Sequence, residues 1–363
     1  EALLKSKTLE SLDLWDNKIG DPGAVAIGNA IRSRGCVLTY LNLWKGTIGA
    51  EGADSIVSAL ERNHTLTHLD ISYNPIGPEW EERDNIANPS DHEQAVLTSN
   101  RIYEQFVKAL GKALKGNNTL SYLNVCSLKS TGLESRAGVE IGRALAVNTN
   151  LIHLDLWDNK IGIKGAKSIG MALQNNANCT VNFLNLWGNR IGDVGCLCIS
   201  NAIKENQFLN FRVLILSENQ IGDVGARAIG MAIRERKYMK KMQLSLCTNS
   251  ITSAGAESIR MSMERLPGSE LIVDLSYNFI EEVDRYKNVK GIIIDNGDAD
   301  RDVDEPLRDT LNYFKISGLA RFFVREKLFE ATAIPARFLQ TFGFSHQEID
   351  IFKEELERNI QRN

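Results

Sequence analysis

The sequence has little of what marks a disulfide-bonded, membrane-spanning or nucleic-acid-binding protein. Its 363 residues include six cysteines without CxxC or regular disulfide spacing, so we expect reduced thiols in a cytosol-like compartment. No apolar run approaches the roughly 18 to 20 residues of a membrane span, and the first residues lack a secretory signal pattern. A net charge of −4 argues against nucleic acid, because phosphates require a basic face. We therefore expect a cytoplasmic protein that binds neither nucleic acid nor membrane.

Residue spacings typical of catalytic and metal sites are also missing. The five histidines form no HExxH motif and no Cys/His pair, and the glycines recur regularly without the GxGxxG or P-loop spacing. The acidic run from Asp295 alternates possible calcium ligands, but Val303 stands where the bend of a calcium loop needs glycine. We read this run as a solvated hinge. The sequence thus predicts no enzymatic activity, no cofactor and no metal.

A repeat of about 30 residues extends over residues 9–297. Its template is LxxLxLxxNxIG, as in LESLDLWDNKIGD from Leu9 and LIHLDLWDNKIGI from Leu151. Each unit begins with the two-residue apolar period of a strand and ends with the i, i+3, i+7 spacing of a helix. Such units must stack, because neither element buries its apolar side alone. The anchor slot of the template is occupied by Asn17, Gly46, Asn74, Leu128, Asn159, Asn189, Asn219, Asn249 and Asn278.

This repeat sequence closely resembles the leucine-rich repeats of the ribonuclease-inhibitor type. The resemblance implies an α/β solenoid, shaped as a horseshoe with an inner parallel β-sheet and outer α-helices. It also implies that the anchor Asn side chains bond to neighbouring turns, and that concave aromatic and acidic residues bind protein partners. The anchor intervals are 28 to 31 residues except for one of 54, which contains an insertion.

We divide the chain into three parts. Residues 1–297 form the solenoid of about nine repeats, with an insertion near 78–101 in the third; residues 298–304 are an acidic hinge; and residues 305–363 form a small helical C-terminal module. Eight of the 13 Phe residues lie in the last 66 residues, at helical spacing. The insertion is read either as a tolerated surface loop or as a wall beside the concave face.

The register of the repeat predicts which side chains project from the concave sheet. Two residues before the anchor stand Trp15, Trp44, Trp157 and Trp187; four before it stand Asp13 and Asp155; six before it stand Tyr40, His68, Tyr122, His153 and Phe183; and beside it stand Asp16, Tyr73, Asp158 and Glu218. We predict an exposed aromatic and acidic surface that binds a partner. The alternative is that the tryptophans only stack on their neighbours across the sheet.

The resulting hypothesis is a non-catalytic, monomeric recognition scaffold whose partner protein has a basic or aromatic surface. The uniform repeats and Glu-rich end, FKEELERNIQRN, also resemble secreted leucine-rich-repeat effectors of intracellular bacteria. That resemblance implies an effector, or a regulator of a host or effector protein, acting in host cytosol. In the alternative, the repeats direct an active or membrane-docking C-terminal helical module to its target.

Overall fold

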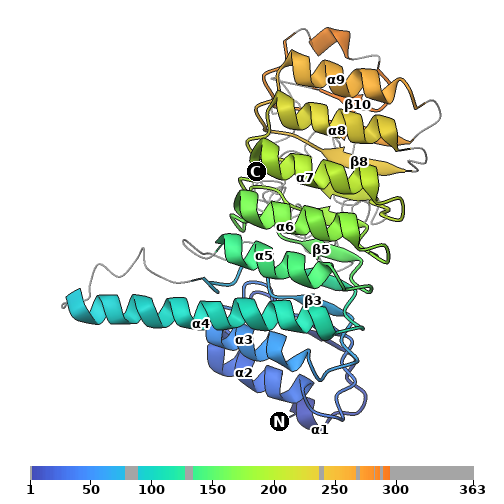
Figure 1. Ribbon diagram of the computed structural model, residues 1–363. Coiled ribbons are helices and arrows are strands. Elements are labelled where there is room, and N and C mark those ends of the chain that lie inside the picture. Colours follow the sequence, from blue (N-terminus) through green and yellow to red (C-terminus); the bar gives the residue numbers. More distant parts are fainter. Residues whose placement is uncertain are drawn as a thin grey trace, which may run out of the picture.

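A repeating strand and helix build an open solenoid (Figure 1). The computed structural model describes residues 2–77, 89–126, 134–236, 241–266, 270–281, 283–286 and 289–294. Ten strands form one parallel sheet in the order β1 to β10, so each strand pairs only with its neighbours in sequence. The predicted α/β leucine-rich-repeat solenoid is confirmed. The hinge at 298–304 and the module at 305–363 lie outside the described residues.

The strands are short and the helices lie beside one another on one side of the sheet (Figure 1). The strands are β1 Ser11–Asp13, β2 Tyr40–Asn42, β3 His68–Asp70, β4 Tyr122–Asn124, β5 His153–Asp155, β6 Phe183–Asn185, β7 Val213–Ile215, β8 Met242–Ser245, β9 Leu271–Asp274 and β10 Ile292–Ile293. The helices are α1 Ala2–Lys5, α2 Gly20–Ile31, α3 Ala50–Ala59, α4 Pro89–Gly116, α5 Glu134–Leu145, α6 Gly162–Asn175, α7 Gly192–Glu205, α8 Asp223–Glu235 and α9 Ser253–Met263, followed by the 3₁₀ helix η1 Val283–Arg285.

Equivalent residues of successive repeats pair directly across the sheet. Leu12 pairs with Leu41, and Leu41 pairs with Leu69. The leucine slots therefore form continuous buried columns between the sheet and the helices. This in-phase stacking also aligns each of the remaining positions of the repeat in a row across the sheet.

The anchor asparagines form the expected ladder. The side-chain amide of Asn219 donates to the carbonyl oxygens of Leu186 and Ser217, at 2.7 and 2.9 Å. Its side-chain oxygen accepts from the backbone N–H groups of Asn189 and Ile191, at 3.0 and 3.3 Å. Asn219 thus pairs backbone groups of the repeat before it, which would otherwise be buried without partners. In the first repeat, Asn17 is exposed and bonds to Leu14 and Trp15 of its own repeat.

A second buried asparagine ladder, which is not part of the LxxLxLxxNxIG template, lies where the helices end. In each case the amide donates to carbonyl oxygens of the preceding repeat, as Asn176 does to Leu145 at 2.7 Å and to Asn148 at 2.8 Å. The members are Asn63, Asn117, Asn148, Asn176 and Asn206. In the next repeat Arg236 takes the slot and donates to Ile203 at 3.0 Å. The available signal was an Asn three residues before the first leucine of several repeats.

Aspartates of the Ile-Gly-Asp (IGD) motif connect consecutive helices. One carboxylate oxygen of Asp193 accepts from the backbone N–H groups of Gly222 and Gly225, at 2.7 and 2.9 Å. Asp21 and Asp223 make the same contacts to the repeats that follow them. A carboxylate at a helix N-terminus satisfies N–H groups that have no partner within the helix and complements the helix dipole.

The insertion lengthens one helix of the layer. Helix α4 has 28 residues, against 10 in α3 and 12 in α5. Helix α6 begins at Gly162, and Tyr103 is the residue of α4 at the same distance from the ladder residue that follows the helix, Asn176 or Asn117. Residues 89–102 are therefore the added length, about 21 Å of helix. Residues 89–101 of the insertion extend the helix layer past its neighbours instead of covering the sheet (Figure 1). Residues 78–88 lie outside the described residues.

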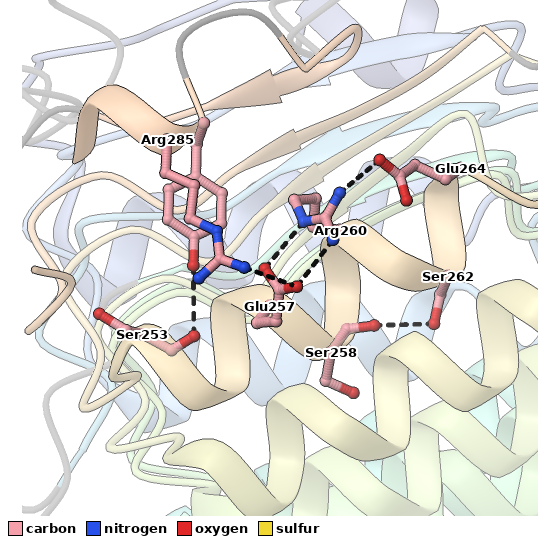
Figure 2. Close-up of polar contacts among 8 residues, drawn as sticks. Ser253, Glu257, Ser258, Arg260, Ser262, Glu264 and Arg285 are labelled. Atoms are coloured by element: carbon pink, nitrogen blue, oxygen red, sulfur yellow. Dashed lines mark hydrogen bonds and ion pairs between the residues drawn. The ribbon is translucent and has the colours of Figure 1, made fainter. Parts of the chain in front are cut away.

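An ion-pair network holds the final turn of the described solenoid against α9. Figure 2 shows Arg260 of α9 between Glu257 of the same helix and Glu264 directly after it, with Arg285 of η1 reaching Glu257 at 3.3 Å. The hydrogen bond from the Arg260 guanidinium lowers the pKa of the Glu257 carboxyl. Nearby, the Tyr286 hydroxyl donates to the carbonyl of Ser253 at 3.3 Å. These contacts tie η1 to the last long helix of the described residues.

Replacing Asn219 with alanine should destabilise the solenoid. The change leaves at least one buried backbone N–H or C=O group without a partner, which costs about 1 to 3 kcal/mol. Thermal or urea unfolding followed by circular dichroism would measure the loss. Asn210→Ala, at an exposed position of the same repeat, is the matched control and should unfold as the parent does. Equal stability of the Asn219→Ala chain and the parent would contradict the structural role of the ladder.

Candidate recognition site on the concave face

Five aromatic rings stack along the strands of the sheet face opposite the helices. We call this set the first ring row; it consists of Tyr40, His68, Tyr122, His153 and Phe183. Adjacent ring centroids lie 3.7 to 4.4 Å apart and the planes differ by 4 to 22°. Because strands are spaced by about 4.8 Å, equivalent side chains of neighbouring strands meet face to face. The row is therefore a continuous, rigid apolar strip from β2 to β6.

A second ring row lies at the carboxyl ends of strands β1, β2, β3, β5 and β6. It consists of Trp15, Trp44, Tyr73, Trp157 and Trp187, with adjacent centroids 5.5 to 5.9 Å apart. These rings are tilted or edge to face, both favourable aromatic geometries. The third repeat has Ser72 in the tryptophan slot, and the ring of Tyr73 completes the row there. The backbone of Tyr73 is left-handed, with φ 56°.

An alternating row of Asp and Asn lies between the two ring rows. Its members are Asp13, Asn42, Asp70, Asn124, Asp155 and Asn185, on β1 to β6. The side-chain oxygen of Asp155 accepts from the backbone N–H of Trp157 at 2.9 Å, and Asp13 accepts likewise from Trp15 at 3.2 Å. The amide of Asn185 donates to Asp155 at 3.1 Å. The side chains of this row thus bond to the backbone where each strand ends. This is a structural role for Asp13 and Asp155, which the sequence predicted as binding residues.

Charged turn residues border the second ring row. Asp16, Lys45, Asp158 and Glu218 all have left-handed backbone, with φ between 51 and 53°. The ammonium group of Lys45 lies 3.0 Å from the Asp16 carboxylate and 5.5 Å from the Trp44 ring centroid. A non-glycine residue in this conformation costs of order 1 kcal/mol or more, so these side chains are held by the surrounding turns. Glu218 and Asp16 are exposed, whereas Asp158 is half-buried.

The structure brings the sequence-predicted site residues onto one face, but their exposure differs from the prediction. Trp157, Trp187 and Phe183 have 8, 7 and 6% of their surface exposed, so the expectation that they are open to solvent is wrong. The two indoles pack on each other and on Cys126, Tyr73 and Ile215. The half-buried members are Trp15, Trp44, Tyr40, Tyr73 and His153. Substitutions at Trp157 or Trp187 would therefore test packing and recognition together.

The face changes character beyond β6. Ser217 and Ser245 lie 2.8 Å apart through their hydroxyl oxygens, and the Cys247 thiol is 3.3 Å from Ser245. Cys126 and Cys247 occupy the position that is Trp in other repeats. The register of the repeat predicts that they project from the concave face, but they have only 2 and 1% of their surface exposed. Burial raises the pKa of the Cys247 thiol well above its ordinary value. Burial also raises the pKa of Cys196 to about 12.

Among the described residues, no group of three or more His, Cys, Asp or Glu could hold a metal ion. The helices in that part of the chain include none that is both long and apolar enough to cross a membrane. The run from Asp295, considered as a calcium loop, lies outside the described residues.

Comparison with known proteins agrees with the geometry. A family model described as "Leucine Rich repeat" matches residues 5–28, 62–79, 147–170, 177–200 and 209–230. The chain is a leucine-rich-repeat protein. Leucine-rich-repeat domains generally bind protein partners, which makes protein interaction the first role to test for this chain.

Three curated relatives contain similar repeats. "NACHT, LRR and PYD domains-containing protein 14" of Homo sapiens is 35% identical over 181 residues, covering 50% of this chain and 14% of the relative. Its Mus musculus counterpart is 27% identical over 201 residues, covering 47% and 20%. "NACHT, LRR and PYD domains-containing protein 3" of Homo sapiens is 27% identical over 194 residues, covering 46% and 19%. The chain thus spans a fifth or less of the length of these relatives.

The two histidines of the first ring row should make the fold sensitive to acid. Burial lowers the pKa of His68 to about 3, and burial together with the charge on His68 lowers that of His153. Folding therefore opposes protonation, so stability is complete above pH 6.5 and falls as the pH drops toward 3. At pH 5 His68 should cost about 2 kcal/mol, and His153 should add to that loss because its pKa is also lowered.

The test is urea unfolding at pH 7 and pH 5. The double variant His68→Phe and His153→Phe keeps rings in the row and should lose less stability at pH 5 than the parent. His64→Phe, at an exposed position outside both rows, is the control and should follow the parent. An identical pH dependence of the double variant and the parent would show that the histidines titrate freely in the folded state.

Proposed function

We propose that the concave face recognises a protein partner, with the two ring rows as the centre of the interface and the charged turn residues as its rim. The observation that carries this proposal is the pair of continuous ring rows, ten rings over six adjacent strands. Aromatic side chains dominate interface hot spots because they bury a large area and lose little conformational entropy on binding. Stacking on neighbours fixes these rings before a partner arrives, which lowers that entropy cost further.

The charges favour a partner with a basic or aromatic surface. Asp16, Asp158 and Glu218 border the second ring row, and Lys45 is the one cation that the structure places against Asp16 among the described residues. An arginine or lysine of a partner could stack on Trp44 or Trp15 and pair with a carboxylate of the rim. Rim charges act mainly on the rate of association and on specificity.

Recognition without catalysis is the role that this chemistry favours. A nucleophilic cysteine needs a lowered pKa, and burial raises the pKa of Cys179, Cys196, Cys198 and Cys247 instead. We propose a monomeric scaffold that acts in cytosol. A role as a secreted bacterial effector in host cytosol is supported by the sequence resemblance alone. The alternative, in which the repeats deliver the C-terminal module at 305–363 to a target or a membrane, is supported by its Phe content.

Replacing Trp44 with alanine should weaken partner binding. Trp44 is half-buried in the second ring row and contacts Trp15 and Tyr73, so its truncation should cost about 2 kcal/mol of binding free energy. Proteins captured from lysate by the parent chain but not by the variant would be identified by mass spectrometry, and their affinities measured by calorimetry. Val194→Ala, at an exposed apolar position on α7, is the control. Equal affinity of parent and Trp44→Ala would place recognition elsewhere.

Asp158→Asn should act on association more than on affinity. The change removes one rim carboxylate while keeping the size of the side chain and its φ of 51°. With a basic partner, the association rate should fall and its dependence on salt should become shallower, while dissociation stays near the parent value. Stopped-flow or surface-resonance kinetics at two salt concentrations would separate the rates. An unchanged salt dependence would contradict electrostatic steering by this rim.

A further inference from the structure

We propose that residues 306–344 of the chain's own C-terminal segment occupy the concave face, with Phe322 and Phe323 on the ring rows and the neighbouring basic residues against the acidic rim. The inference rests on the proposed function only in its choice of face. It assigns that face an occupant within the same chain, which a partner must displace before it can bind.

Composition provides the first argument. Residues 306–344 contain seven Phe, six Lys or Arg and three Asp or Glu, so the segment is aromatic with an excess of three basic residues. In RFFVREK, Arg321 and Arg325 flank the pair Phe322 and Phe323. The rim residues Asp16, Asp158 and Glu218 have the opposite charge, and the ring rows beside them are apolar. The segment therefore has the basic and aromatic character that the concave face favours in a partner.

The position of the segment provides the second argument. The described chain ends with Ile294, directly after β10 at the edge of the sheet. From β10 to β5 are five strand spacings, about 24 Å. Residues 295–305 can span up to about 36 Å when extended, so the segment can reach the ring rows. A tether of this length raises the effective concentration to the millimolar range, where a weak contact is populated.

The open side of the sheet provides the third argument. The sheet face that carries the rows is opposite the helix layer, and the helices of the described ranges cover only the other side (Figure 1). Stacking covers the planes of a ring but leaves its outer edge open. Trp15, Trp44 and Tyr40 accordingly keep part of their surface exposed. A contiguous aromatic strip on a face that no described helix covers is the kind of surface that a partner segment binds.

The tryptophans make the inference measurable without a partner. Four of the five Trp residues belong to the second ring row, and residues 306–344 contain none. In the full chain, Phe322→Glu with Phe323→Glu should release the segment, giving a red shift of Trp emission and stronger quenching by acrylamide. A synthetic peptide of residues 306–344 should reverse both changes, and the same peptide with the two Glu substitutions should not.

Controls separate release of the segment from loss of structure. Phe208→Glu and Phe279→Glu change exposed Phe residues outside the ring rows, at 71 and 70% exposure, and should leave Trp emission unchanged. Circular dichroism checks that each variant is folded. If the double Phe variant unfolds, Asp158→Lys with Glu218→Lys leaves the C-terminal segment intact and should also raise quenching, because the rim then repels the basic residues.

Two results would overturn the inference. One is unchanged emission and quenching in the folded Phe and rim variants alike. The other is a parent chain that light scattering finds to be a dimer whose dissociation on dilution produces the red shift, because the segment would then occupy a second copy. Neither result depends on partner capture, so this inference and the proposed recognition function can fail separately.

Discussion

In-register stacking of side-chain ladders is the constraint on which the rest of this structure depends. A solenoid with three-residue strands has few sheet hydrogen bonds per repeat and many turns, so its buried turn backbone must be paired by side chains. Two asparagine ladders and the IGD aspartates supply that pairing, each from one repeat to the next. Because bonds of all three sets cross a repeat boundary, they fix the position of a repeat against its neighbours as well as its internal fold.

The concave face follows from the same constraint. Once the ladders hold the repeats in phase, any side chain that recurs in a slot must lie beside its equivalents at strand spacing. Flat rings fit that spacing face to face, which accounts for the 3.7 to 4.4 Å separations of the first ring row. The concave face is therefore rigid because the backbone ladders are rigid, and the side-chain amide of Asn189 bonds directly to the carbonyl of Trp187 in the second ring row.

The repeat spacing was enough to predict the solenoid and its parallel sheet, and the resemblance to ribonuclease-inhibitor-type repeats implied the anchor ladder. The face was predicted in composition but not in exposure. A slot rule identifies the side of the sheet to which Trp157 points; it does not reveal that the indole packs on Trp187, Cys126 and Tyr73. Likewise, Asp155 was predicted as a binding residue from its charge, whereas its bond to the backbone of Trp157 depends on the conformation of the turn. Tyr73 completes the second ring row from an adjacent slot, which a fixed template cannot anticipate.

The alternating row between the rings makes the surface period twice the period of the core. Leucine columns repeat with every strand, but Asp and Asn alternate from Asp13 on β1 to Asn185 on β6, so the surface repeats about every 9.6 Å. Each carboxylate thereby has amide neighbours in place of another carboxylate at strand distance. Loss of one inner repeat that carries Asn, such as that of β2 or β4, would preserve the core yet bring two carboxylates side by side, whereas loss of two adjacent repeats would keep the alternation. The interior of this region is thus compatible with adding or removing one repeat at a time, whereas its surface is compatible only with changes of two repeats at a time.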